Sequence, residues 1–319
     1  MTLPAIFNTL KLPVIAAPMF ILSGKEMVIE QCKAGIVGSF PALNARGEGE
    51  FEKWLQDITE ELDRYNQANP DAPAAPFAVN QIVFKSNARL QEDMDLCVKY
   101  KVPIIITSLG ANEDVNSAAH SYGGIVMHDV INQRFAKKAI DKGADGLIAV
   151  ATGAGGHAGL LSPFALIQEI REWFDGPLAL SGCIATGDSV LAAQAMGADF
   201  AYIGSAFIAT KEANAESAYK QMVVDSYADD IVYSDYFTGV SGNYLKPSIK
   251  AAGMDPDNLP KGDIAAMNSL TDQASDAKAW KDIWGCGQGV GAVDEITTVT
   301  DRVNQIKQEY VAAKARLSL

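Results

Sequence analysis

The sequence predicts a single (β/α)8 barrel, in which eight parallel strands form a closed ring and helices cover its outside. Two observations carry this prediction: short apolar runs alternate with longer amphipathic stretches, and there are eight runs with seven stretches between them. A length of 319 residues also suits such a barrel with one added segment. An open doubly wound sheet is the alternative, but no G-x-G-x-x-G sequence follows the first run.

The eight expected strands are brief, rich in small or β-branched residues, and apolar on both faces. This is typical of a parallel sheet that is covered on both sides. The expected strands are Val14–Met19, Gly35–Phe40, Phe77–Gln81, Pro103–Leu109, Gly124–His128, Gly146–Ala151, Pro177–Ser181 and Phe200–Phe207.

The seven stretches between them have apolar residues at helical spacing. The expected helices are Gly24–Ala34, Glu48–Asn66, Ser86–Tyr100, Asn112–Ser121, Asn132–Lys142, Pro163–Phe174 and Gly187–Met196. We expect side-chain oxygens to cap four of them, those of Ser86, Asn112, Ser162 and Thr186. Gly143 and Gly197 are expected to end two helices in the left-handed conformation.

The alternating pattern stops after the eighth run. We expect residues 211–291, which are rich in Asp, Asn, Tyr and Gly, to form a mostly helical insertion or lid that is not an independent domain. Residues 1–210 and 292–319 then make up the barrel, and a C-terminal helix over Val293–Leu317 closes its outer ring. The insertion is a candidate lid, a dimer contact or both, so a homodimer is one expected assembly.

Charge and cysteine content exclude several classes of protein. The net charge of −13 argues against nucleic acid or an anionic membrane surface as the main partner. The four cysteines are widely spaced and form no C-x-x-C pair, which argues against a zinc site, any other metal site or a disulfide framework. The sequence has neither a signal-peptide pattern nor an apolar run long enough for a membrane helix, so we expect a soluble, cytoplasmic protein.

The strongest candidate for chemistry is the loop after the sixth strand. Active sites of such barrels lie at the carboxyl ends of the strands. Residues 151–159 contain four glycines in seven positions, and His157 is the ionisable side chain among them. Glycines leave the backbone open to close approach by a ligand. A flexible turn with an incidental histidine is the alternative, but the position favours a functional His157.

A second candidate lies after the seventh and eighth strands. Ser181-Gly182-Cys183 and Gly204-Ser205 can present backbone N–H groups and hydroxyls to a phosphate. Neither motif contains Lys or Arg, so backbone dipoles would hold the phosphate. Tight turns without a ligand are the alternative.

Other side chains leave two interpretations open. His128 is either a residue at the edge of the core or a ligand contact, and Cys183 is either a nucleophile or a small packing residue. The aromatic residues of the insertion either pack within it or form the wall of a pocket; they are Tyr233, Tyr236, Phe237 and Tyr244.

At these positions the sequence resembles the nitronate monooxygenase family, formerly called 2-nitropropane dioxygenases. The resemblance rests on an ordered set of motifs along most of the barrel and beyond it. They are Ala17-Pro-Met19, Phe77-Ala-Val-Asn80, Gly155-Gly-His-Ala-Gly159, Leu180-Ser-Gly182, Gly197-Ala-Asp-Phe-Ala-Tyr-Ile-Gly-Ser205, Thr238-Gly-Val-Ser-Gly-Asn-Tyr-Leu-Lys-Pro-Ser248 and Gly285-Cys-Gly-Gln-Gly-Val-Gly291.

The resemblance implies a non-covalent FMN, with His157 as the active-site histidine near the reactive face of the flavin. It implies that the flavin ring, ribityl chain and phosphate contact Ala17, Pro18, Met19, Asn80, Gly155, Gly156, Ser181, Gly182, Cys183, Tyr202, Gly204 and Ser205. It also implies an activity: an alkyl nitronate reduces the flavin, and oxygen chemistry yields a carbonyl compound and nitrite.

The sequence departs from the family pattern at three positions. Val150 and Gly153 stand near the places where a Gln and a Glu are expected, and Asp129 stands where related proteins often carry Lys. These departures leave two rival functions open. One is an FMN enzyme that uses NAD(P)H to reduce a quinone or an enoyl thioester, and the other is a non-catalytic flavin-binding barrel.

Overall fold

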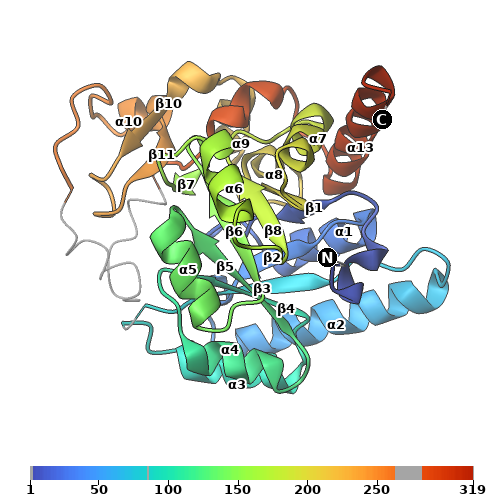
Figure 1. Ribbon diagram of the computed structural model, residues 1–319. Helices are drawn as coiled ribbons and strands as arrows, with labels where there is room; N and C mark the ends of the chain where they lie inside the picture. Colours follow the sequence, from blue (N-terminus) through green and yellow to red (C-terminus); the bar gives the residue numbers. More distant parts are fainter. Residues whose placement is uncertain (1–2, 85, 263–281, 319) are drawn as a thin grey trace.

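The computed structural model describes residues 3–84, 86–262 and 282–318. Eight parallel strands form a barrel with helices around it (Figure 1). The barrel strands are β1 (Val14–Ala16), β2 (Gly38–Pro41), β3 (Phe77–Ile82), β4 (Ile104–Ser108), β5 (Ile125–Val130), β6 (Gly146–Val150), β8 (Leu178–Ser181) and β9 (Phe200–Ile203). They pair in the order β1-β9-β8-β6-β5-β4-β3-β2, and a parallel bridge between Ile15 and Val37 closes the ring. The predicted barrel is therefore confirmed.

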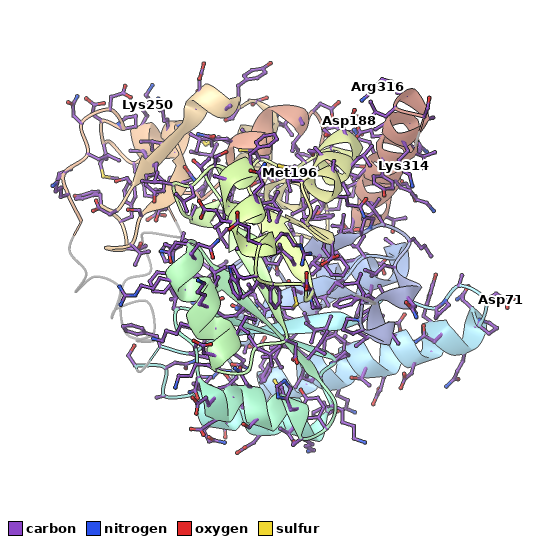
Figure 2. All side chains as sticks on the ribbon, in the orientation of Figure 1. Asp71, Asp188, Met196, Lys250, Lys314 and Arg316 are labelled. Carbon is purple, nitrogen blue, oxygen red and sulfur yellow. The ribbon has the colours of Figure 1, made fainter. Side chains whose placement is uncertain are left out.

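Helices lie between the strands and shield the outside of the ring. They are α1 (Lys25–Ala34), α2 (Glu50–Ala68), α3 (Leu90–Lys99), α4 (Glu113–His120), α5 (Gln133–Asp141), α6 (Pro163–Arg171), α7 (Gly187–Ala195) and the short α8 (Ser205–Ile208). The C-terminal helix α13 (Val299–Arg316) packs against α7 and α1, as expected of a helix that completes the ring. Asp188 of α7 and Arg316 of α13 form an ion pair near the ends of these helices (Figure 2).

Two of the four predicted helix caps are confirmed. The side chain of Asn112 accepts a hydrogen bond from the N–H of Asp114, and the side chain of Thr186 accepts one from Ser189. Gly143 and Gly197 have φ of 92° and 111°, in the left-handed region expected after the two helices.

The other two predicted caps are wrong. The turn before α3 is held by Asn87, whose side chain accepts a hydrogen bond from the N–H of Arg89, and the helix therefore begins at Leu90 and not at Ser86. The side chain of Ser162 accepts no capping hydrogen bond.

Several other boundaries differ from the expected ones, and the two largest differences have a clear cause. The eighth barrel strand ends at Ile203, because the chain turns at Gly204 and begins α8 at Ser205. The C-terminal helix begins at Val299 rather than Val293, after Thr298 caps it by accepting from the N–H of Asp301.

The core has two layers. Side chains such as Ile15, Ile104, Met127 and Ile148 fill the inside of the barrel, and a larger apolar layer separates the strands from the helices. At the amino end of the strands Phe7 packs on the ring of Phe200, with 4.6 Å between ring centroids. The barrel is thus closed at that end, and its carboxyl end carries the loops in which we look for a site.

The segment after α8 contains both helices and strands. Its described elements are α9 (Ser217–Val224), β10 (Ile231–Ser234), β11 (Gly242–Leu245), α10 (Lys246–Ala251) and short 3-10 turns at Ala228–Asp230 and Gln288–Ala292. The strands β10 and β11 form an antiparallel sheet with β7 (Gly156–His157), which lies in the loop after β6. The alternation along the sequence did not predict these strands. No helix in the described parts of the chain is both long and apolar enough to span a membrane.

Candidate active site

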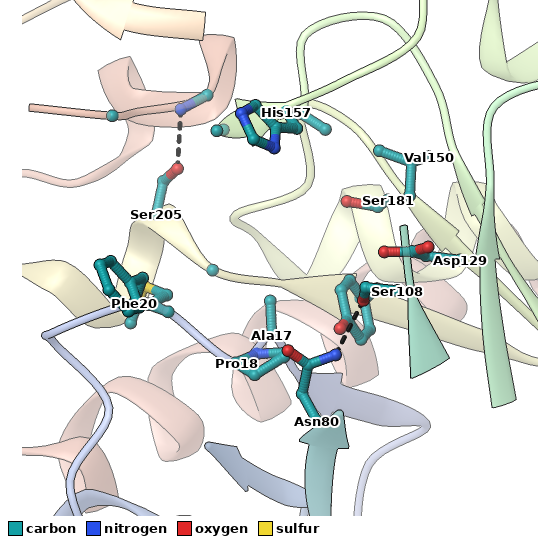
Figure 3. Close-up of a pocket in the computed structure, with 18 of the residues that line it drawn as sticks. Ala17, Pro18, Phe20, Asn80, Ser108, Asp129, Val150, His157, Ser181 and Ser205 are labelled. Carbon is teal, nitrogen blue, oxygen red and sulfur yellow. Dashed lines mark hydrogen bonds between the residues drawn. The ribbon is translucent and has the colours of Figure 1, made fainter. Parts of the chain in front are cut away.

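One cavity lies at the carboxyl end of the barrel, and the thirteen site residues predicted from the sequence all line it (Figure 3). They are Ala17, Pro18, Met19, Asn80, Gly155, Gly156, His157, Ser181, Gly182, Cys183, Tyr202, Gly204 and Ser205. The structure brings them together from the ends of β1, β3, β6, β8 and β9. Their roles toward a ligand remain predictions.

The wall formed by the loop after β1 is held by polar side chains. The N–H of Met19 donates to Ser23 Oγ at 2.9 Å, and Asn44 Nδ2 donates to the carbonyl of Met19 at 3.0 Å. At the end of β3, Asn80 Nδ2 donates to Ser108 Oγ at 2.8 Å. The apolar surface of Met19 and the polar end of β3 are therefore fixed before any ligand binds.

The loop that carries His157 is anchored by the inserted segment. Gly156 and His157 form β7, which pairs with Asn243 and Gly242 of β11. The buried side chain of Asn243 also donates to the carbonyl of Ala154 at 2.7 Å. The loop is therefore a short edge of a sheet, held by backbone pairing and by the Asn243 side chain.

The glycines of this loop allow protein backbones to pack on one another. A Cβ at Gly155 would lie 2.8 Å from the nitrogen of Gly287 and 3.1 Å from Ser205 Oγ, and a Cβ at Gly153 would overlap Cys183 Sγ. The N–H of Gly287 donates to Ser205 Oγ at 2.8 Å (Figure 3). We expected these glycines to admit a ligand, but at Gly153 and Gly155 the close neighbours are other protein segments.

His157 lies in the cavity with its ring bonded to the inserted segment. Its Nε2 is 2.8 Å from Thr238 Oγ1, and Thr238 Oγ1 also donates to the carbonyl of Val240 at 3.0 Å. A hydroxyl has one hydrogen, so Nε2 is the donor when that hydrogen goes to the Val240 carbonyl. Burial lowers the pKa of His157 to about 4, which makes the ring neutral at physiological pH.

Asp129 enters the same cavity from the end of β5. Its carboxylate is hydrogen-bonded by Ser108 and by the N–H of Leu109, and Leu109 has φ of 62°, which is uncommon for a residue with a side chain. Burial raises the pKa of Asp129 to about 6, against the effect of both hydrogen bonds. Successive residues of a strand point to opposite faces, so His128 points away from the cavity and bonds Thr107 in the outer layer.

The turn after β8 is suited to an anion. Gly182 and Cys183 have φ of 136° and 58°, and in the described structure the backbone N–H groups of Gly182, Cys183 and Ile184 donate to no protein acceptor. The first turn of α8 adds N–H groups that have no acceptor within the helix. Such a group of free donors fits a phosphate. The described lining of the cavity contains no Lys or Arg, as the motifs predicted.

The structure resolves one open interpretation in favour of packing, that of the aromatic residues of the insertion, and it leaves Cys183 exposed with a thiol that is not activated. Burial raises the pKa of the Cys183 thiol, and no cation that would activate it lines the described cavity. Tyr233, Tyr236, Phe237 and Tyr244 are absent from the described lining; Phe237 packs on Tyr244, with 4.9 Å between ring centroids. The described residues also contain no group of His, Cys, Asp or Glu that could hold a metal ion.

Asp129, Ser108 and Thr238 were not among the predicted site residues, although Asp129 stood out as a departure from the family pattern and Thr238 as part of a motif. The alternation along β5 was the available signal for Asp129. The side chain of Met127 fills the inside of the barrel, and Asp129, two residues later, lies on the same face of the strand. Thr238 lies 81 positions from His157, and no local pattern relates the two.

The sequence profile described as nitronate monooxygenase matches residues 3–309, nearly the whole chain. The chain belongs to the nitronate monooxygenase family. This is a family of flavin-dependent oxidoreductases, and membership therefore implies a flavin cofactor for this chain. Nothing in the described lining opposes such a cofactor.

Individual relatives in the family are distant. A nitronate monooxygenase of Paraburkholderia phytofirmans is 25% identical over 278 residues, which cover 76% of each chain. A probable nitronate monooxygenase of Staphylococcus haemolyticus is 25% identical over 66% of this chain and 64% of its own length. A putative monooxygenase of Mycobacterium tuberculosis is 24% identical, and the match spans 63% of that relative, slightly less than two thirds.

Solved structures share the fold over the full length. FabK from Thermotoga maritima has a TM-score of 0.80 and 22% identity, with 100% of this chain and 99% of that chain covered. A nitroalkane oxidase from Streptomyces ansochromogenes has a TM-score of 0.77 and 21% identity, covering 98% and 100%.

Proposed function

We propose that this enzyme uses FMN to oxidise alkyl nitronates, such as propionate 3-nitronate, with oxygen to a carbonyl compound and nitrite. The observation that carries the proposal is the position of His157: it lies in one cavity with all twelve residues that the family resemblance assigns to the cofactor. Family membership and the curated relatives named nitronate monooxygenase support it.

In this proposal the phosphate of FMN binds at the turn Gly182–Ile184 and at the start of α8, where backbone N–H groups are unpaired with protein. Asn80 and Met19 contact the flavin from the ends of β3 and β1. The flavin, when bound, supplies the electron acceptor that side chains lack. The protein supplies the position of the ring and the polarity around it.

His157 orients the substrate in this proposal and does not need to remove a proton. A nitronate is already a carbanion-like anion, so its oxidation does not require a strong base. The ring of His157 is neutral at physiological pH and is held through Nε2 by Thr238. When Nε2 donates to Thr238, Nδ1 of the neutral ring carries no hydrogen: the ring then positions a nitronate by contact, and Nδ1 can act as a base if a neutral nitroalkane binds.

A second candidate is an FMN-dependent reductase that takes hydride from NAD(P)H. A relative from Rhodococcus jostii, 23% identical over 64% of this chain and 58% of its own length, is named as a dehydrogenase of an indene-carboxyl-CoA. The CoA part of such a substrate carries a pyrophosphate, and no cation in the described lining would bind it. A small anion without a pyrophosphate fits this lining better, which favours a nitronate.

The test is an anaerobic absorbance titration of the FMN-bound protein with propionate 3-nitronate and, separately, with NADH and NADPH. We expect nitronate to bleach the flavin or form its semiquinone, and NAD(P)H to leave it oxidised. Rapid bleaching by NAD(P)H alone would assign the reductase function. An FMN complex that neither donor reduces would leave a non-catalytic flavin-binding barrel, and failure to bind FMN would refute the proposal.

A further inference from the structure

The polar part of the cavity contains a carboxyl group to which the proposed function gives no role. Asp129 lines the cavity between the ends of β4 and β6, close to Ser108 and Ser181 (Figure 3). Asn80 Nδ2 donates to Ser108 Oγ at 2.8 Å, which leaves the hydroxyl hydrogen of Ser108 for Asp129. The N–H of Leu109 is its second donor.

The other titratable side chains of the described lining keep one charge state between pH 5 and 8. Burial holds the pKa of His157 near 4, and it raises the pKa values of Tyr202 and Tyr219 well above their usual 10. Burial also raises the pKa of Cys183 above its usual 9. Asp129, at about 6, is therefore the group in this lining whose charge changes across neutral pH.

Charged groups on the elements around β5 do not face Asp129 from inside the barrel. Lys138 of α5 acts on His128, which belongs to the outer layer. The charge of Asp129 is felt by the Tyr202 hydroxyl of β9, whose pKa it raises further. The neighbours from β4, β6 and β8 are Ser108, Val150 and Ser181, none of which carries a charge. No described cation compensates an ionised Asp129 there.

We propose that Asp129 binds an electron-rich group of the cofactor or substrate as a neutral carboxylic acid, so that filling the cavity takes up one proton from solvent. An ionised carboxylate only accepts hydrogen bonds, whereas the protonated acid donates one to a carbonyl, nitro or phosphate oxygen. A ligand that covers Asp129 also removes its remaining water, and this further favours the neutral form. The proton adds to a carboxylate oxygen, and no bond of the ligand changes.

The inference rests on the proposal that FMN binds here, but not on which substrate the enzyme oxidises. The test measures protons taken up when FMN binds to the flavin-free protein, by calorimetry in two buffers of different ionisation enthalpy. A carboxyl with a pKa of about 6 is about 90% ionised at pH 7 and about 10% ionised at pH 5. We therefore expect uptake of about 0.9 proton per FMN at pH 7 and about 0.1 at pH 5.

Two variants assign the proton. Asp129→Asn keeps the shape and should abolish this uptake, whereas Asp63→Asn removes an equivalent charge from the exposed face of α2 and should leave it unchanged. FMN brings an ionisable phosphate of its own, so riboflavin is titrated in parallel. The same difference between wild type and Asp129→Asn with both flavins places the effect at the ring, and a difference with FMN alone places it at the phosphate.

Equal proton uptake by wild type and Asp129→Asn, or the same uptake at pH 5 and pH 7, would overturn the inference. The pH comparison with riboflavin, which has no phosphate to titrate, needs wild-type protein alone, so it tests the inference even if the variant does not fold. Proton uptake without nitronate oxidation would refute the proposed substrate and leave this inference standing. Nitronate oxidation without proton uptake would support the proposed substrate and refute this inference. Absence of flavin binding would refute the proposed function and the inference together.

Discussion

The contact between Gly155 and the segment around Gly287 makes a sharp prediction for Gly155→Ala. The new Cβ would lie 2.8 Å from the Gly287 nitrogen, 3.1 Å from the Cys286 carbonyl carbon and 3.1 Å from Ser205 Oγ. Two of these three atoms belong to backbone, so they cannot move aside as the end of a flexible side chain can. The substitution must push the Gly285–Gly291 segment away from the loop.

The size of the effect follows from this overlap. Overpacking a fitted contact typically costs about 1–3 kcal/mol of the free energy of unfolding. An unfolding entropy of about 2.1 cal/mol/K per residue gives roughly 0.7 kcal/mol per kelvin for 319 residues. We therefore expect Tm of the flavin-free protein to fall by about 1.5–4.5 °C. FMN affinity should fall as well, because Gly287 bonds Ser205 at the proposed phosphate site.

The matched control is Gly24→Ala. Gly24 has φ of −102°, which alanine adopts readily, and the nearest atom to a new Cβ is Glu26 Oε2 at 3.5 Å. This variant should stay close to the wild type in Tm, because alanine reduces the entropy of the unfolded chain but is a poorer N-cap of α1 than glycine. Calorimetry and flavin-fluorescence titration measure both quantities. Equal Tm and equal FMN affinity in Gly155→Ala and Gly24→Ala would refute the packing argument.

Three further predictions concern single side chains. His157→Ala should lower kcat/KM for propionate 3-nitronate by about 100-fold or more. Thr238→Val removes the hydrogen bond to Nε2 and should lower kcat/KM by about tenfold. A nitrite assay that finds Thr238→Val fully active would contradict the role of Thr238 in orienting His157. Asp129→Asn should stabilise the flavin-free protein at pH 8 by up to about 3 kcal/mol, but much less at pH 4. The folded state holds the Asp129 proton more tightly than the unfolded state. Protonated Asp129 therefore stabilises the wild type at low pH, and this contribution is lost as pH rises from 3.8 through about 6. Urea unfolding in which the difference in free energy between variant and wild type does not change with pH would disprove the prediction. Cys183→Ser should retain most activity, since the thiol is not activated. Loss of nitrite formation with FMN still bound would instead indicate that Cys183 acts as a nucleophile.

The barrel was predictable because each of its elements has a local pattern. Apolar runs of strand length, helical spacing and the two Gly-Ala-Asp helix ends at Gly143 and Gly197 all depend on neighbouring residues. The residues of the cavity followed because the carboxyl ends of all barrel strands meet on one face. Resemblance to the family then added the cofactor and the reaction.

The anchoring of His157 was not predictable in the same way. Its strand β7 is two residues long and pairs with β11, about 85 residues away in the sequence. A strand this short shows no alternation of apolar and polar residues by which it could be predicted. The buried Asn243 and Thr238 were visible as motif residues, but their partners Ala154 and His157 follow from the tertiary fold. The alternation of side chains along β5 could have placed Asp129 in the cavity, but His128 was considered as the ligand contact on this strand.

The three-stranded sheet gives the enzyme two separate sources of rigidity. Ala17 and Asn80, which face the proposed cofactor, lie at the ends of barrel strands, whereas His157 is carried by an edge paired with the inserted segment. Exchanging that segment for the corresponding one of a relative would therefore change the direction of the histidine without changing the residues of the proposed flavin site. Substrate range and cofactor affinity can in this way diverge independently, except where Gly287 bonds Ser205 and ties the two together.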